Sequence, residues 1–239
     1  MRGLLVVDLG LASYADTLAL QREVARARIA GDVEDDVLLL VEHPPVITLG
    51  RSSKSAHMLA TPEYLRARGV ELFEVERGGD VTFHGPGQLV GYPIIDLKQH
   101  RRDLHWYLRQ VEQFLIDGLA ALGLRCDRNP PYTGVWIENR KIASIGVHAR
   151  DWVTWHGFAL NVSTDLRYFD LIVPCGIQAV TMTSVNAELP TAQQSVGVVA
   201  DAVVAAAADT FGLSPRGIGL HELTSPLQAS PTAAERAVN

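Results

Sequence analysis

The sequence predicts one mixed α/β domain of the α+β class. Stretches patterned like β-strands outnumber those patterned like helices, and many follow one another directly, which disfavours a doubly wound parallel sheet. The chain has 239 residues, of which 47% are hydrophobic and 20% charged, as is typical of a globular enzyme with a sizeable core. We place the domain at residues 1–222. Residues 223–239 are rich in Ala, Ser, Thr and Pro and are expected to form a disordered tail.

The first half of the chain is predicted to form a helix among several strands. Ser13 is a typical N-cap residue, and Gly31 can end the same helix in a left-handed conformation. The strands are apolar runs bounded by Pro, Gly or charged residues. In chain order, the elements are the strand Leu4–Asp8, the helix from Ser13 to Gly31, and the strands Val37–Glu42, Val46–Leu49, Glu71–Glu76 and Leu89–Leu97.

The second half is predicted to begin and end with a helix. Apolar residues at spacings of three and four predict the first helix, and a capping box of Thr191 with Gln194 predicts the second. A turn at residues 138–140 joins two short strands into a hairpin. In chain order, the elements are the helix from Leu104 to Gly123, the strands Gly134–Ile137, Ile142–Val147 and Phe158–Val162, and the helix from Thr191 to Gly212.

The composition excludes several classes of function. The formal net charge is −6, and because phosphate binding usually requires a basic surface, no nucleic-acid partner is expected. The N-terminal apolar run is too short for a signal peptide, and Asp201 interrupts the longest stretch of small apolar residues. We therefore expect a cytoplasmic protein without a membrane span. No Cys-x-x-Cys or His-Glu-x-x-His motif occurs, so no metal site is expected.

A glycine-rich segment, Arg77–Gln88, is the first candidate for ligand binding. Glycine lets backbone pass close to a ligand where side chains would collide, so Gly78, Gly79, Gly85 and Gly87 would leave a smooth slot. The alternative is a pair of tight turns around a short strand. For an arbitrary chain this alternative is the commoner one, because glycine usually punctuates loops.

Two further residues have the chemistry of a nucleophile and its partner. Cys175 stands between Pro174 and Gly176, so it is expected on a turn rather than inside a packed element. Lys141 follows the predicted hairpin turn and leads into an apolar strand. Free cysteines are more often inert core residues, and most lysines are simply solvated. Cys126 has no comparable setting and is interpreted as structural.

These segments together resemble the octanoyltransferases of lipoate biosynthesis, and the similarity covers nearly the whole chain before the tail. A single matching block would be weak evidence, but several blocks in the order typical of the family are specific. The blocks are Glu42–Pro45 with Thr48–Arg51, Arg77–Gln88, Lys141–Gly146, His156–Asn161, Pro174–Ile177 and Thr183–Ser184.

The resemblance implies a fold and a set of residue roles. The fold would be the catalytic domain shared by biotin and lipoate protein ligases. Cys175 would carry an octanoyl group as a thioester, and Lys141 would activate it. The chain departs from the family at Asp80, where a longer side chain is common. The acyl pocket would be lined by Arg77, Gly78, Gly79, Asp80, Val81, Thr82, Phe83, His84, Ser144, Ile145, Gly146, Gly157, Phe158 and Ala159.

The resemblance also implies the substrates. The donor would be octanoyl-acyl carrier protein, and the acceptors would be lysines on lipoyl domains of 2-oxoacid dehydrogenase complexes and on the glycine cleavage H protein. No cofactor is expected, because a thioester already carries the activation that amide formation requires. Backbone amides near Gly176 would hold the oxyanion of the tetrahedral intermediate.

Other functions remain open at the level of sequence. An ATP-dependent lipoate or biotin ligase has the same fold and a similar lysine, although its usual third consecutive glycine is missing after Gly79. A cysteine hydrolase could use His84 or His156 as its base. The chain could also be a non-catalytic protein that binds acyl carrier protein, in which case the setting of Lys141 and Cys175 would be accidental.

Overall fold

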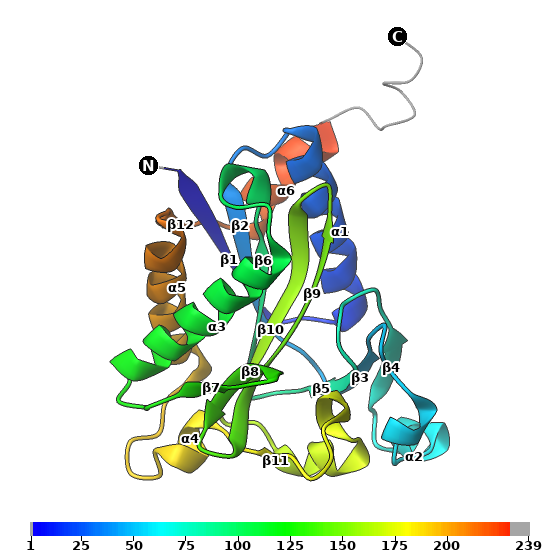
Figure 1. Ribbon diagram of the computed structural model, residues 1–239. Helices are drawn as coiled ribbons and strands as arrows, with labels where there is room; N and C mark the ends of the chain where they lie inside the picture. The colour runs from blue at the N-terminus through cyan, green and yellow to red at the C-terminus, as the bar shows by residue number, and fades with distance from the viewer. Residues whose placement is uncertain (1, 230–239) are drawn as a thin grey trace.

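The computed structural model describes residues 2–229 as a layered domain, in which helices cover both faces of a large β-sheet (Figure 1). In spatial order, the large sheet contains β12 (Ser214–Gly217), β1 (Gly3–Leu11), β2 (Asp36–Glu42), β6 (Gln88–Ile94), β10 (Val153–Asn161), β9 (Arg140–Arg150), β8 (Tyr132–Ile137) and β7 (Asp127–Asn129). The short strand β11 (Thr181–Met182) also pairs with β9. A second, smaller sheet contains β4 (Glu71–Glu74), β3 (Val46–Leu49) and β5 (Val81–His84).

The pairing within the large sheet is mixed. β1 runs parallel to both β2 and β12. From β2 onward, through β6, β10, β9 and β8 to β7, neighbouring strands are antiparallel. Antiparallel neighbours need only short connections, and turns at residues 138–139 and 151–152 supply two of them. The prediction of a mixed α/β domain is confirmed.

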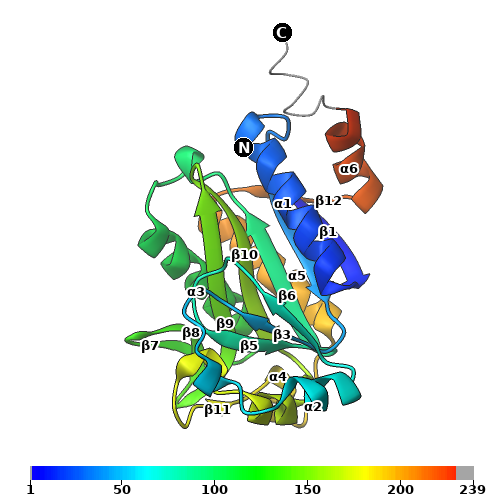
Figure 2. The ribbon, with the colours of Figure 1, turned by 90° about the vertical axis from the view of Figure 1, so that its right-hand side faces the viewer.

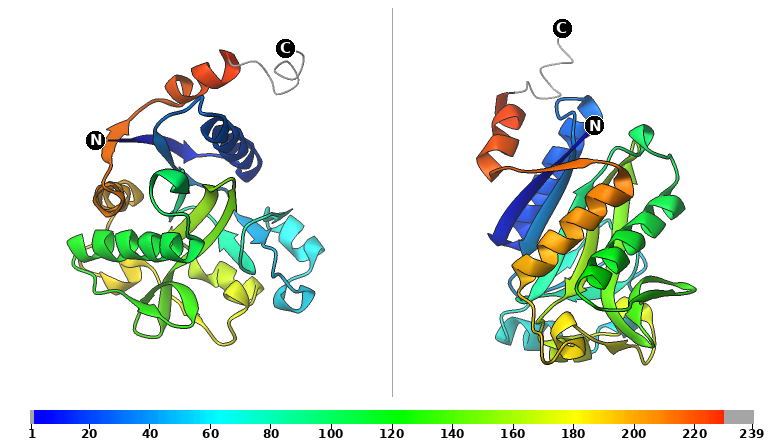
Figure 3. Two further views of the ribbon diagram at one scale, coloured as in Figure 1. Left: turned by 45° about the horizontal axis from the view of Figure 1, so that its top comes forward. Right: turned by 90° about the vertical axis from the view of Figure 1, so that its left-hand side faces the viewer.

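Helices bury both faces of the sheet (Figure 3). The helices are α1 (Tyr14–Ala30), α2 (Pro62–Ala67), α3 (Leu104–Ala121), α4 (Val185–Glu188), α5 (Val196–Phe211) and α6 (Leu220–Ala229). Alternate residues of a strand point to opposite faces. In β2, Leu38 and Leu40 join the core beneath α3 and α5. Val37, Leu39 and Val41 join the core beneath α1 and α6. No helix within residues 2–229 is long and apolar enough to cross a membrane.

The last large helix, α5, begins later than predicted. Its N-cap is Ser195 and not Thr191. The N–H of Gln194 donates to the Asn186 side chain at 2.7 Å, and the same side chain donates to the Gln194 C=O at 3.1 Å. Because this pair of bonds holds Gln194 against Asn186 of the short helix α4, α5 can begin only after it. The end of α5 at Gly212, with a φ of 65°, is as predicted.

The predicted disordered tail is wrong for residues 223–229, which belong to α6. Leu223 is buried in the core that covers α1 and β1, and Leu227 packs against the same core. Figure 2 shows α6 beside α1 and β1. Two leucines among Ser, Thr and Pro hardly change the composition of this segment, so its composition did not indicate a helix. They nevertheless supply apolar cover for the sheet. Residues 230–239 lie outside the described residues.

Long-range pairing extends two strands beyond their predicted bounds. β9 and β10 form one antiparallel ladder that begins with Val153 opposite Arg150 and ends with Leu160 opposite Ala143. Polar residues such as His148 are part of this ladder, so the local apolar pattern understates its length. The short helix α2 was also not predicted, although Thr61 caps it. These differences arise where tertiary contacts decide the structure.

Candidate active site

The backbone presents Cys175 from a tight turn. This turn, Pro174–Gly176, lies at the end of the large sheet that the smaller sheet flanks (Figure 2). Cys175 has a φ of 57° and a ψ of 18°, a left-handed conformation that residues other than glycine seldom adopt. The segment before it is fixed by Val173, whose N–H donates to the His57 C=O at 2.8 Å. Backbone conformations of this kind are concentrated at functional sites.

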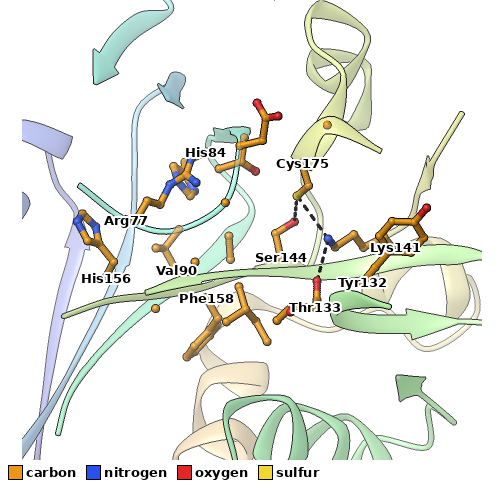
Figure 4. Close-up of a pocket in the computed structure, with 18 of the residues that line it drawn as sticks. Arg77, His84, Val90, Tyr132, Thr133, Lys141, Ser144, His156, Phe158 and Cys175 are labelled. Atoms are coloured by element: carbon orange, nitrogen blue, oxygen red, sulfur yellow. Dashed lines mark hydrogen bonds between the residues drawn. The ribbon is translucent and has the colours of Figure 1, made fainter. Parts of the chain in front are cut away.

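Lys141 reaches Cys175 from the strand β9 (Figure 4). Its Nζ lies 3.4 Å from Cys175 Sγ and donates to the Thr133 C=O at 3.1 Å. The lysine is only 1% exposed, and its Nζ lies 5.3 Å from the centre of the Trp136 ring. Ser144, on the same strand, places Oγ 3.6 Å from Sγ. The structure therefore brings together the two residues that the sequence singled out.

Cys175 is the group in contact with Lys141 that can carry a negative charge. An ammonium in contact with a thiol stabilises the thiolate, which is the nucleophilic form. Among residues 2–229, the salt bridges do not include Lys141, so no carboxylate contacts it directly. A buried charge without an opposite charge is costly. The contact with Cys175 is therefore the one through which Lys141 can activate the thiol as a nucleophile.

A cavity of about 310 Å³ opens beside Cys175. Figure 4 shows Cys175 and Lys141 on one side of it and Arg77, His84 and His156 on the other, with Val90 and Phe158 between. Of the predicted pocket residues, those that line it are Arg77, Gly79, Asp80, Thr82, His84, Ser144, Ile145, Gly146, Gly157, Phe158 and Ala159.

Three predicted pocket residues do not line this cavity. Val81 and Phe83 alternate along β5 with the two cavity-lining residues of that strand, so they face the core of the smaller sheet. Gly78 instead donates its N–H to the Val147 C=O at 2.8 Å. The sequence located the correct segment, but it could not tell which side of the segment faces the ligand.

The smooth slot predicted from the glycines of Arg77–Gln88 is largely wrong, because only Gly79 among them lines the cavity. A Cβ on Gly85 would lie 2.5 Å from the Phe83 ring. A Cβ on Gly87, which has a φ of 79°, would lie 2.6 Å from Ser163 Oγ. These two glycines therefore relieve crowding within the protein and do not shape the ligand site.

Several cavity-lining residues were not predicted as pocket residues, and all of them except Ile177 come from segments far from Cys175 in sequence. Most are apolar or aromatic residues of ordinary strands and helices, and no local pattern distinguishes them from core residues. A local signal existed at two of them, because Ile177 ends the Pro174–Ile177 block and Thr133 precedes a glycine, Gly134. These residues are Tyr14, Val90, Tyr92, Pro131, Tyr132, Thr133 and Ile177; His156 and Gly176, which were predicted in other roles, also line the cavity.

The two amides that follow Cys175 do not support the predicted oxyanion site near Gly176. The Gly176 N–H donates to the Val173 C=O at 2.9 Å, and the Ile177 N–H donates to the Pro174 C=O at 3.1 Å. Both amides therefore close the turn that presents the cysteine. Ser144 Oγ, 3.6 Å from Sγ, is a polar group that remains beside the sulfur.

His84 lines the cavity, and it is neutral together with its neighbour His43. Burial lowers the pKa of His84 to about 3 and that of His43 to about 4. His84 Nδ1 lies 2.8 Å from Gln88 Oε1, to which the neutral ring donates. His43 Nδ1–H donates to the Ala12 C=O at 2.8 Å, and its Nε2 accepts from the Tyr92 hydroxyl at 2.7 Å. These rings hold the cavity wall by hydrogen bonds.

The lowered pKa values of His43 and His84 predict that the protein loses stability in mild acid. Both folded-state values lie below the ordinary value of 6.5, so the unfolded chain takes up more protons as pH falls below about 6.5. Each ring should then cost up to about 1.4 kcal/mol per pH unit. Urea unfolding at pH 7 and pH 5 measures this slope. The double variant His43→Gln/His84→Gln should show a smaller loss of stability between pH 7 and pH 5. His105→Gln, at an exposed position, should lose as much stability as the wild type. An unchanged slope in the double variant would contradict the assignment of the acid sensitivity to these two rings.

His156 is a poor candidate for the base of a cysteine hydrolase. Its Nε2 lies 3.8 Å from Glu76 Oε1. Burial lowers the pKa of His156. Figure 4 places both His84 and His156 across the cavity from Cys175, and within residues 2–229 the hydrogen bonds of Cys175 Sγ go to Lys141 and Ser144. The geometry therefore favours lysine, not histidine, as the partner of the thiol.

Arg77 and Asp80 have separate roles in the cavity wall. Arg77 is buried, which lowers its pKa, and it donates to the Thr48 C=O at 2.7 Å. Asp80 Oδ2 lies 2.6 Å from His57 Nδ1. A Cβ on Gly176 would lie 2.5 Å from the same Asp80 oxygen. Asp80 therefore lies directly beside the turn that presents Cys175.

Comparison with known families matches residues 13–208 to the lipoyl protein ligase A/B catalytic domain. A relative from Rubrobacter xylanophilus, named octanoyltransferase, is 54% identical over 182 residues, which is 75% of this chain and 81% of the relative. This chain belongs to the octanoyltransferase family. Octanoyltransferases from Nostoc sp. and Synechococcus elongatus are 46% and 45% identical to it, over 87% and 91% of the chain and 92% and 91% of their own lengths.

Solved structures confirm that this octanoyltransferase-family chain has the fold of lipoate protein ligases. The putative lipoate protein ligase of T. acidophilum, with bound lipoic acid, has a TM-score of 0.75 at 18% identity and covers 95% of this chain and 93% of its own. A lipoate-protein ligase A bound with ATP also has a TM-score of 0.75, at 19% identity, and covers 95% of this chain and 92% of its own. At these identities the likeness establishes the fold alone.

Proposed function

We propose that this acyltransferase moves an octanoyl group from octanoyl-acyl carrier protein to lysines of lipoyl domains, with Cys175 as the acyl carrier and Lys141 as its activator. The proposed acceptors are the lipoyl domains of 2-oxoacid dehydrogenase complexes and the glycine cleavage H protein, and the proposed compartment is the cytoplasm. One observation supports this best: Lys141 Nζ lies 3.4 Å from Cys175 Sγ, at the edge of a cavity of about 310 Å³.

In the first half-reaction, the Cys175 thiolate attacks the carbonyl carbon of the donor thioester. A new carbon–sulfur bond forms to Cys175, and the bond to the sulfur of the carrier breaks. The carrier leaves as a thiolate and is protonated to the thiol. One thioester replaces another, so the step is close to isoenergetic, and it requires a thiolate because the neutral thiol is a poor nucleophile.

In the second half-reaction, the neutral amine of the acceptor lysine attacks the octanoyl-Cys175 carbonyl. A carbon–nitrogen bond forms, the carbon–sulfur bond breaks, and Cys175 leaves as a thiolate. The proton lost by the amine can pass through Lys141 when its side chain is unprotonated, or it can leave to water. Amide formation from a thioester runs downhill, so the reaction needs no nucleotide.

The cavity offers the octanoyl chain an apolar path away from the sulfur. Val90 and Phe158 line it between the Cys175 side and the opposite polar wall (Figure 4). Ile145 is a further apolar lining residue. Each methylene buried there contributes about 0.8 kcal/mol. A medium-length chain can therefore gain several kcal/mol of binding from the part of the substrate that does not react.

We expect transfer to proceed without ATP. A ligase must activate a free acid as an acyl-adenylate, whereas a thioester donor is already activated. The measurement is formation of octanoyl-lysine amide on a purified lipoyl domain, with octanoyl-acyl carrier protein and no nucleotide or magnesium. The control replaces the thioester with free octanoate and ATP. If product forms only in that control, the chain is a ligase and the proposed thioester role of Cys175 is wrong.

A further inference from the structure

The buried ammonium of Lys141 needs an explanation beyond its contact with Cys175. The side chain is 1% exposed, and its described polar partners are Cys175 Sγ and the Thr133 C=O. Acylation of Cys175 removes the one described contact of Nζ that can carry a negative charge. A single carbonyl is weak compensation for a desolvated ammonium. The surroundings of the Thr133 carbonyl therefore decide how readily Lys141 keeps its proton.

A buried carboxylate lies on the other side of that carbonyl. Glu112, on α3, is 0% exposed, and its Oε1 accepts the N–H of Gly134 at 3.1 Å. The N–H of Gly134 and the C=O of Thr133 belong to the same peptide group. They point in opposite directions, because a trans peptide is planar. The contacts therefore form a continuous series from the Glu112 carboxylate, through one peptide group, to Lys141 Nζ and on to Cys175 Sγ.

We propose that Glu112 is a positioning residue of the active site, which holds Lys141 in place and favours its charged form through the Thr133–Gly134 peptide group. This inference rests on the proposed role of Lys141 as the activator of Cys175. A carboxylate at the N–H end polarises the peptide group and makes its carbonyl oxygen a stronger acceptor. Hydrogen bonds to charged groups are also stronger than neutral ones.

The arginines paired with Glu112 do not cancel this effect. Glu112 Oε2 accepts from Arg109 and Arg128, whose side chains are 48% and 30% exposed. Charges in contact with water are screened, whereas a fully buried carboxylate is screened much less. The carboxylate is also closer to the peptide group, which it contacts directly. The field of Glu112 therefore dominates at the Thr133 carbonyl.

Gly134 fixes the orientation of the peptide group. Its φ is 137°, and a Cβ at this position would lie 2.6 Å from the Ala143 C=O and 2.7 Å from Lys141 Cε. A side chain here would displace both the neighbouring strand and the lysine. Because only glycine fits, the peptide group stays aligned between Glu112 and Lys141.

The test uses the small number of lysines in the protein. The sequence contains only Lys54, Lys98 and Lys141, so ¹³C-lysine labelling gives few Cε resonances, and a Lys141→Met sample assigns the relevant one. Glu112→Gln keeps an acceptor for the Gly134 N–H but removes the charge. We expect the pH midpoint of the Lys141 resonance to be lower in this variant than in the wild type, because a nearby negative charge has been removed, with the signals of Lys54 and Lys98 unmoved.

Asp36→Asn is a matched control for the loss of a buried carboxylate. Asp36 is 1% exposed, pairs with Arg28 at 2.9 Å and accepts the Asp96 N–H at 2.9 Å, but it does not line the cavity. This variant should lose stability and leave the Lys141 midpoint unchanged. Equal shifts in the two variants, or no shift in Glu112→Gln, would overturn the proposal.

A measurement on the wild-type protein keeps the proposal testable if Glu112→Gln does not fold. The amide proton of Gly134 should change its chemical shift with the same midpoint as Lys141, because both ends of the peptide group respond together. If the Gly134 resonance does not change during the lysine titration, the proposed coupling through the Thr133–Gly134 peptide group is wrong. The lysine titration also tests the role of Glu112 separately from the proposed function. Glu112 can act on Lys141 in a protein that forms no octanoyl-enzyme, and octanoyl-Cys175 can form in a protein whose Lys141 does not respond to Glu112.

Discussion

Cys175→Ala is expected to eliminate the octanoyl-enzyme and to lower octanoyl transfer by at least about a thousandfold, because the variant lacks the atom that carries the acyl group. Intact-mass spectrometry after incubation with octanoyl-acyl carrier protein measures the first effect. One octanoyl adduct is expected on the wild-type protein and none on the variant. Amide formation on a lipoyl domain measures the second effect.

Cys126→Ala is the matched control for this experiment. Burial raises the pKa of Cys126 to about 12, so its sulfur remains a thiol at neutral pH and is a poor nucleophile. The Cys126 variant should keep both the adduct and the transfer rate. An octanoyl adduct that survives Cys175→Ala but disappears in Cys126→Ala would show that Cys126, and not Cys175, carries the acyl group, and would contradict our proposal.

The parts of the site that local chemistry determines could be predicted from the sequence. Cys175 between proline and glycine implies a turn, and the structure has one at Pro174–Gly176. The capping glycines Gly31 and Gly212 end their helices as expected, because both adopt the left-handed conformation. In each case the information lies within a few residues of the feature that it determines.

The contacts of the site could not be predicted in the same way, because they depend on strand register and on packing across the sheet. Lys141 meets Cys175 because β11 pairs with β9 just after the nucleophile turn, with Met182 opposite Lys141. Nothing near Lys141 in sequence indicates this pairing. Glu112 lies on a helix whose periodicity predicts only that one face is buried. Its contact with the Gly134 N–H could therefore not be predicted from the sequence.

Which face of β5 lines the cavity could also not be predicted from the sequence. The family resemblance located the segment, and a strand period would have separated its residues into two sets. Which set faces the ligand depends on where the smaller sheet packs. Phe83 lies against Phe169, with ring centres 5.7 Å apart, and this contact turns His84 towards the cavity. That packing joins segments far apart in the chain.

Lys141→Met is expected to separate catalysis from stability. Without the lysine beside it, the Cys175 sulfur should be a weaker nucleophile. Acylation by the donor should therefore slow roughly a hundredfold, and alkylation of Cys175 by iodoacetamide at pH 7 should slow as well. The fold should not suffer, because a buried charge is replaced by an apolar chain of similar length and the remaining partner becomes a neutral thiol. The urea midpoint should therefore stay the same or rise.

Lys98→Met provides the comparison for Lys141→Met, because Lys98 is exposed and its ion pair within residues 2–229 is with Asp96, at 3.6 Å. It should acylate and alkylate at the wild-type rate. Single-turnover acylation distinguishes the activating role from a role in the second half-reaction: a slow first step with normal release of a preformed octanoyl group assigns Lys141 to the thiolate. If Lys141→Met forms the octanoyl-enzyme as fast as the wild type, the 3.4 Å contact with Cys175 does not activate the nucleophile, and Lys141 acts on the acceptor amine instead.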